Sequence, residues 1–241
     1  MLVVVSALVV VLATPRARAH CVATHQVLMM LTPTGTILGP EDDVVVVAVT
    51  VTDEGMDGDP RPRPDARSLV LVQGATRIAA VLSPIVPGMW RLLPVTTPPA
   101  GTWTIEGLPG SVEYLDTAPG GSAPPLAPDV RTLTYAEQHE GRYTTRSMEL
   151  SLASDIPGDV VAVAGWWSSA AHVEGGGSWA RVTTGTRGAT IYAGGGHCDT
   201  ASPRTSPADP GEHARVAFID RRGHVSVWVT DVPVRRGRGA H

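Results

Sequence analysis

The valine run between Asp43 and Val51 is the feature of this sequence that most constrains its fold. Positions 44–49 read VVVVAV, with no polar side chain among them. β-Branched side chains favour an extended backbone, and a short apolar run bounded by polar residues is typical of a buried central strand. We therefore predict a buried strand here, with other strands on either side of it.

Further short strand patterns follow along the chain, without helical periodicity. In the first half they alternate with turns rich in glycine and proline, and they cover residues 27–31, 68–73, 77–82, 88–93 and 102–105. About seven more candidates lie in the second half, and a length of 241 residues with 43% hydrophobic content favours two cores. Because short strands at this spacing favour antiparallel sandwiches, we expect an all-β chain of two immunoglobulin-like antiparallel β-sandwich domains.

A change in composition marks the boundary between the two halves. Residues 118–125 read APGGSAPP. This stretch suits neither a central strand nor a helix interior, because proline lacks an amide donor and both proline and glycine interrupt regular structure. The predicted organisation is a signal peptide over residues 1–19, a first sandwich over 20–116, a Pro/Gly-rich linker over 117–128, a second sandwich over 129–234 and a basic tail over 235–241.

The last two strand candidates predict a hairpin. Residues 213–220 and 224–230 both fit strands, and Arg221-Arg222-Gly223 between them suits a tight connection.

The first nineteen residues have the features of a secretory signal peptide. An apolar run from Leu2 to Ala13 is too short to cross a bilayer core of about 30 Å as a helix. Ala17-Arg18-Ala19 then supplies the small-x-small pattern of a cleavage site, although no positive charge precedes the apolar run. We expect a mature chain that begins at His20, has no membrane span, and is secreted or periplasmic.

Charge and motif content exclude several functional classes. The formal net charge of -4 leaves no polycationic face, so nucleic acid is not an expected partner, and we interpret the terminal arginines as a solvated tail. The sequence has no serine elbow and no HExxH, and the triple glycines at 175–177 and 194–196 do not lead into a helix, as a phosphate-binding loop would require. We therefore expect no catalytic residues and no enzyme activity; an enzyme with an unrecognised site is the weakest alternative.

The two cysteines, Cys21 and Cys198, predict a disulfide bond. They are the only cysteines in the chain, and metal-type CxxC spacing is absent. In an oxidising compartment two such cysteines pair more often than they stay free. The bond would fasten the mature N-terminus to the second half of the chain.

Each of these cysteines follows a histidine, which raises the alternative of copper binding. A mature N-terminal His20 would offer an α-amine and an imidazole, and a further imidazole would help to complete the nitrogen site that Cu(II) prefers. The predicted disulfide would bring His197 close to His20, and His25 follows on the same stretch. The competing interpretation, which we favour, is that these histidines only flank a structural disulfide. We expect the others to be surface or half-buried residues: His139, His172, His213, His224 and His241.

Part of the first half resembles a known family. The pattern Pro33-x-Gly35-x-x-Leu38-x-Pro40-x-x-Asp43-Val44-Val45-Val46, followed by Gly101-x-Trp103, is similar to parts of the periplasmic copper-carrier β-sandwiches of the CopC type. The likeness covers about residues 20–106 and implies a sandwich in which His20 serves as an N-terminal copper ligand. The chain departs from that family in carrying Cys21 and in lacking its Asp-x-His ligands.

The second half, over residues 129–235, resembles bacterial surface modules of the immunoglobulin or fibronectin type III class, which implies an adhesive or spacing role. Trp166 and Trp167 are adjacent in a predicted strand, so their side chains should face opposite ways, and one of them would lie outside the core. Such a tryptophan could contact a protein or a carbohydrate surface. The sequence thus indicates a secreted or periplasmic, non-catalytic binding or structural protein of unknown ligand and without a cofactor, with copper binding as the alternative.

Overall fold

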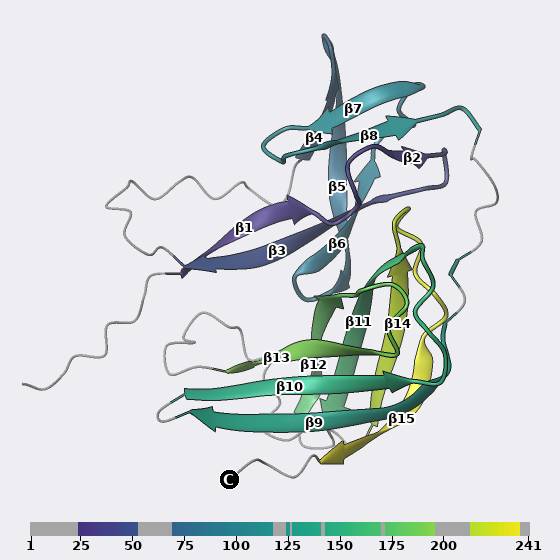
Figure 1. The fold of residues 1–241 in the computed structure, drawn as a ribbon. Coiled ribbons are helices and arrows are strands. Elements are labelled where there is room, and N and C mark those ends of the chain that lie inside the picture. The colour runs from purple at the N-terminus through teal and green to yellow at the C-terminus, as the bar shows by residue number, and fades with distance from the viewer. Residues whose placement is uncertain are drawn as a thin grey trace, which may run out of the picture.

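A computed structural model describes residues 24–52, 69–117, 124–125, 127–140, 143–169, 172–195 and 213–236. Every regular element in these ranges is a strand (Figure 1). This confirms the all-β class and the sandwich architecture expected from the sequence. Within the same ranges, no helix has the length and apolar character needed to cross a membrane.

The first eight strands form one sheet. They are β1 (Thr24–Met30), β2 (Thr36–Leu38), β3 (Val44–Thr52), β4 (Leu69–Gln73), β5 (Thr76–Val86), β6 (Met89–Pro94), β7 (Gly101–Ile105) and β8 (Ser111–Tyr114), in the order β1-β3-β6-β5-β4-β7-β8-β2. All neighbours are antiparallel except β2 and β8. Strands from both ends of this order bury side chains in a single core, so the sheet folds over itself into a sandwich. The largest side chain in this core is that of Trp103, whose indole nitrogen donates to the Pro99 carbonyl at 2.9 Å.

The last seven strands form a second sheet. They are β9 (Val130–Glu140), β10 (Tyr143–Leu152), β11 (Val160–Ser169), β12 (His172–Arg181), β13 (Gly188–Gly195), β14 (His213–Asp220) and β15 (Val229–Arg236), in the order β12-β11-β14-β15-β9-β10-β13. Its core again draws on both ends of the order and includes Trp167 and Phe218. The pairing of β15 with β9 is parallel, whereas we had expected antiparallel neighbours throughout.

The predicted hairpin at the end of the chain is wrong in its second strand. The turn at residues 221–223 is present, and the next residues pair with β14 through the bridge between Ile219 and Val225 and the Ser226 amide, which donates to the Phe218 carbonyl. The regular strand β15, however, starts only at Val229, from where it pairs antiparallel with β14. The buried side chain of Ser226 explains the interruption. Its hydroxyl accepts the amide of Phe218 at 3.0 Å, so a side-chain oxygen occupies a position that a backbone carbonyl would fill in a regular ladder.

Two boundaries also differ from the sequence prediction. Arg235 and Arg236, expected in a solvated basic tail, are the last residues of β15, where Arg235 pairs with Thr134. At the other boundary, Ala127 was assigned to the linker but packs against the core of the second sandwich. Strand pairing and apolar contact therefore outweigh local composition at both places.

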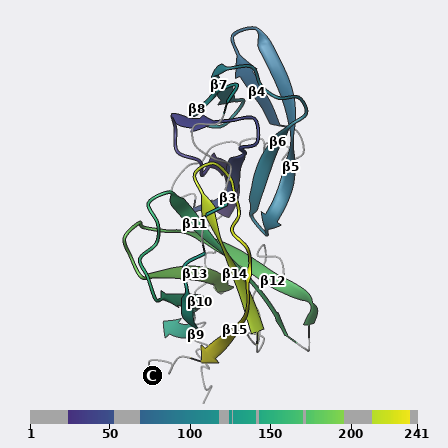
Figure 2. The same ribbon diagram turned by 90° about the vertical axis from the view of Figure 1, so that its right-hand side faces the viewer.

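The valine run has an additional role that its composition did not reveal. Val44 and Val46 point into the core of the first sandwich, whereas Val45 and Val47 belong to a third cluster that includes residues of the second sandwich. Figure 2 shows the two sheets stacked along the long direction of the molecule, with β3 beside β11 and β14. β3 is thus buried on both faces because one face covers its own sandwich and the other contacts the second.

Candidate functional site

The cysteine and histidine pairs lie outside the described residues. This holds for His20, Cys21, His197 and Cys198, so the disulfide and the copper site stay predictions. His25 lies in β1, opposite Val51, and only its backbone is described. Among the residues that the structure describes, no group of three or more histidines, cysteines or carboxylates is arranged to hold a metal ion.

The tryptophan pair on β11 does face two ways. Trp167 is 1% exposed and packs in the core of the second sandwich, while Trp166 is half-buried on the opposite face. A β-carbon added at Gly177 would lie 2.7 Å from the Trp166 ring and 2.8 Å from Pro87, which places that ring against the turn between β5 and β6. Trp166 therefore contributes to the contact between the sandwiches and is only partly open to solvent.

Trp166 also belongs to a cation–π stack. The guanidinium carbon of Arg215 lies 5.5 Å from the centroid of Trp166 and 5.0 Å from that of Trp228. An arginine between two indole rings holds their planes in register and covers apolar surface with its own methylene groups. The stack therefore joins side chains from β11, β14 and the segment before β15.

The two sandwiches share an apolar junction core. Its buried members are Leu31, Val45, Val47, Val86 and Met89 from the first sandwich and Ala162, Ala164 and Ile219 from the second. Trp166, Trp179 and Trp228 of the second sandwich pack against the edge of this core, and β5 is the strand of the first sandwich that lies against β11 and β12. Full burial of an apolar side chain contributes about 1.5–3 kcal/mol. Burial of these shared side chains therefore stabilises the contact between the two sandwiches, which holds them together as one unit.

A polar cluster crosses the same junction. His224, which follows β14, lies with Nδ1 3.0 Å from Oδ2 of Asp220 and with Nε2 2.9 Å from Oδ1 of Asp42, in the loop before β3. The side chain of Asp42 is fully buried, and that of His224 is 12% exposed. The contact with Asp42 lies within ion-pair distance but is not aligned as a hydrogen bond, so the two side chains form an ion pair only when the ring is protonated.

Burial dominates the electrostatics of this cluster. It raises the pKa of Asp43 to about 6, against the opposing effects of Arg91 and His224 and with a further increase from the charge of Asp42. Burial also raises the pKa of Asp220, again opposed by His224. The pKa of Tyr114 is raised by burial and by the charges of Asp43 and Asp42.

The backbones meet beside this cluster. The amide of Asp43 donates to the carbonyl of Arg222 across the junction at 2.8 Å. Next to it, Gly223 has a φ of +81°, and a β-carbon there would lie 2.5 Å from the carbonyl oxygen of Asp43. Only glycine fits this position, because it adopts a positive φ without strain and leaves room for the opposing carbonyl.

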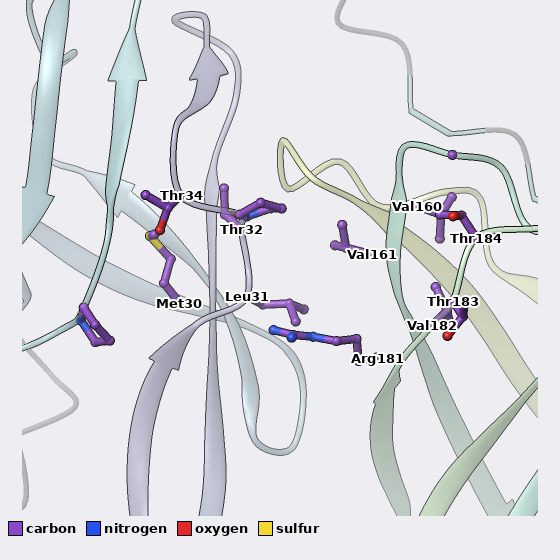
Figure 3. Close-up of a pocket in the computed structure, with 13 residues that line it drawn as sticks. Met30, Leu31, Thr32, Thr34, Val160, Val161, Arg181, Val182, Thr183 and Thr184 are labelled. Atoms are coloured by element: carbon purple, nitrogen blue, oxygen red, sulfur yellow. The ribbon is translucent and has the colours of Figure 1, made fainter.

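An open cleft of about 550 Å³ lies beside the junction, with walls from both sandwiches. Figure 3 shows Met30 to Thr34 on one side and Val160, Val161 and the segment from Arg181 to Thr184 on the other. Among the lining residues that the structure describes, Arg181 is the one with a charge, and three exposed threonines supply hydroxyl groups: Thr34, Thr183 and Thr184. Thr32 is buried, and its hydroxyl oxygen accepts the amide of Val45 at 2.8 Å. The remaining walls are aliphatic side chains, prolines and Gly158.

Neither the cleft nor the polar cluster was predicted from the sequence, where His224 was expected to be an ordinary half-buried histidine. One local signal was present: Asp220 and His224 flank a turn of three residues, so their side chains can meet. No sequence signal connects either of them to Asp42, which belongs to the other sandwich.

Comparisons with known proteins add little to this description. No family model and no curated protein matches the chain. Among solved structures, the FN1-FN3 domains of chicken CNTN1 align over 87% of this chain and 68% of that one, at 9% identity and a TM-score of 0.26. A likeness at that TM-score supports no inference about function, and no comparison supports the resemblance to the copper carriers.

Proposed function

We propose that this chain is a secreted or periplasmic, non-catalytic binding protein whose ligand occupies the cleft between its two sandwiches. The observation that carries the proposal is that residues of both sandwiches line one cleft beside a shared apolar core. Small-molecule sites occur preferentially at such boundaries between folding units and are usually largely preformed. The junction core would hold the two walls of the cleft at a fixed separation.

The chemistry of the lining favours an acidic saccharide. Arg181 is exposed, and no residue in the described part of the chain pairs with it. The protein as a whole carries a net charge of -4, yet no carboxylate is among the described residues that line the cleft. A free guanidinium suits a carboxylate or sulfate group, threonine hydroxyls can donate to and accept from sugar hydroxyls, and the prolines and valines offer apolar surface to a sugar ring.

The location of the one histidine–carboxylate cluster seen in the described ranges supports a non-catalytic role. Asp42 is fully buried, and His224 is nearly so, because both sandwiches cover them. A general base must come within about 3 Å of its substrate, and these side chains face each other across the junction. They are placed to hold the sandwiches together.

A defined panel of oligosaccharides would test the proposal. The mature protein is screened on an array that includes oligogalacturonates, sulfated oligosaccharides and neutral glycans, and each hit is titrated by calorimetry. We expect binding to acidic members and a loss of about 10- to 100-fold with Arg181→Gln, the range for a charge-assisted hydrogen bond. Thr183→Trp should block the cleft, since this exposed side chain lines it.

Thr102→Trp is the matched control, because Thr102 is exposed on β7 and does not line the cleft. Its affinity should equal that of the unmodified protein. Binding that survives both cleft variants, or hits confined to neutral glycans, would rule out the proposed site.

A further inference from the structure

Polar atoms without partners are concentrated where the two sandwiches meet. Five buried side-chain nitrogen or oxygen atoms in the described ranges have no hydrogen-bond partner, and four of them belong to one neighbourhood: Asp42 Oδ1, Arg91 Nε, Tyr114 OH and His224 Nε2. Native proteins leave few such atoms, because each costs about 1–3 kcal/mol. The junction is therefore sensitive to any change of charge within it.

His224 occupies the centre of this neighbourhood, and both of its ring nitrogens face carboxylates. Nδ1 lies 3.0 Å from Asp220 Oδ2, and Nε2 lies 2.9 Å from Asp42 Oδ1. A neutral imidazole has one N–H, whereas the imidazolium ion has two. With a neutral ring between two ionised carboxylates, one nitrogen lone pair would face a negative oxygen inside the protein.

Asp220 and Asp42 belong to different sandwiches, so the charge on the ring decides whether the junction is attractive. Asp220 ends β14 and also accepts the amides of Arg222 and His224, which fixes it in the second sandwich. Asp42 accepts the amide of Gly39 at 2.6 Å, which fixes it in the first. Neither carboxylate can turn away without losing these bonds.

We propose that the bridge Asp42–His224–Asp220 is a proton-controlled latch between the two sandwiches. A proton shared by the ring and its two carboxylates closes the latch, and its loss opens the contact with Asp42. The junction is therefore tight while the ring carries this proton and loosens once the proton is lost. This inference is independent of the ligand proposed for the cleft.

The charged groups around the latch either add negative charge to the junction as the pH rises or are offset by a neighbouring opposite charge. Asp43 lies beside Asp42, and burial raises its pKa to about 6, so its ionisation adds a second negative charge to the junction as the pH rises. Arg91 lies 3.6 Å from Asp43 and offsets part of that charge. Tyr114, with its raised pKa, stays neutral over this range.

Hydrogen exchange at the amide of Asp43 measures the latch directly, because this amide donates across the junction to Arg222. The experiment uses the full chain carrying Asp43→Asn, so that the neighbouring carboxylate does not titrate. Protection is expressed relative to the unfolded-chain rate at each pH. We expect protection at this position to fall about tenfold or more between pH 5.5 and 8.5, because the buried ion pair between His224 and Asp42 is lost. In Asp43→Asn with His224→Gln, it should not change with pH.

Two amides serve as internal controls: that of Glu106, which donates to the Val70 carbonyl within the first sandwich, and that of Ile156, which donates within the second. Their protection should stay constant with pH. Asp42→Asn, in the same Asp43→Asn background, is a second test, since an amide can pair with a neutral ring, and the pH dependence should again be lost.

Nitrogen chemical shifts of the His224 ring provide an independent readout, since they distinguish one N–H from two. Equal protection at pH 5.5 and 8.5 in Asp43→Asn would overturn the latch. So would a fall of the same size after His224→Gln or Asp42→Asn, or a ring that gains or loses no proton over this range.

Discussion

Asp43→Asn should change how stability depends on pH. The pKa of Asp43 is raised from its ordinary value of 3.8 to about 6 because the carboxyl is buried. Between these values the folded protein binds more protons than the unfolded chain, so the free energy of unfolding falls as the pH rises from about 4 to above 6. Each pKa unit corresponds to about 1.4 kcal/mol, which makes the ionised carboxylate about 3 kcal/mol less favourable in the folded state.

This figure is an upper bound, because the Asp43 side chain is 19% exposed and water screens part of its charge. Asparagine has the same shape and no charge, so it imitates the protonated carboxyl at every pH. We expect Asp43→Asn to match the unmodified protein near pH 4 and to exceed its free energy of unfolding by up to about 3 kcal/mol at pH 8.

Urea unfolding at a series of pH values measures this difference. Subtracting one protein from the other removes the contributions of the remaining carboxylates, which are common to both. A companion variant, Arg91→Met, removes the cation 3.6 Å from the carboxylate and should make the fall in stability steeper. In a protein that already carries Asp43→Asn, Arg91→Met should not change how the free energy of unfolding depends on pH. A difference between the two proteins that stays constant from pH 4 to 8 would refute the reasoning.

Three further predictions concern other parts of the chain. Gly223→Ala should lower the free energy of unfolding by about 2 kcal/mol or more, since φ is +81° and the new methyl would meet a carbonyl at 2.5 Å. In the same urea assay Gly185→Ala should cost less, because φ is +75° there but no atom lies within 4 Å of the added carbon. A non-reducing peptide map should recover Cys21 linked to Cys198, and two free thiols would exclude the bond. If the copper alternative holds, electron paramagnetic resonance of the mature protein with Cu(II) will show nitrogen ligation that changes in His197→Ala; an unchanged or absent signal eliminates the paired-histidine site.

The strands could be predicted because the pattern of apolar side chains that indicates each strand lies within the strand itself. The valine run at 44–49 and the largely apolar stretch at 213–220 lie in β3 and β14 of the structure. The period of side-chain hydrophobicity is a local property, and it survives when tertiary contacts form. Predictions failed where a single side chain replaced a backbone group, as at Ser226, or where pairing extended a strand through charged residues, as at Arg235.

The junction could not be predicted, because its parts are polar or apolar residues with ordinary local patterns. Nothing near Asp42 in sequence indicates that its carboxylate lies 2.9 Å from the ring of His224. The tryptophan pair illustrates the same limit. Alternation predicted that Trp166 and Trp167 face opposite ways, but only the packing of the two sandwiches determines that Trp166 meets the turn at Pro87.

The sequence by itself thus determined the all-β class, the position of the central valine strand and the opposite orientation of neighbouring side chains, since these follow from backbone geometry and local hydrophobicity. Tertiary structure decided the rest. It set which face of β3 covers its own sandwich and which contacts the other, and it placed two carboxylates around one imidazole. Such contacts join residues far apart in the chain, and their energies depend on burial, which exists only once both sandwiches have folded and met.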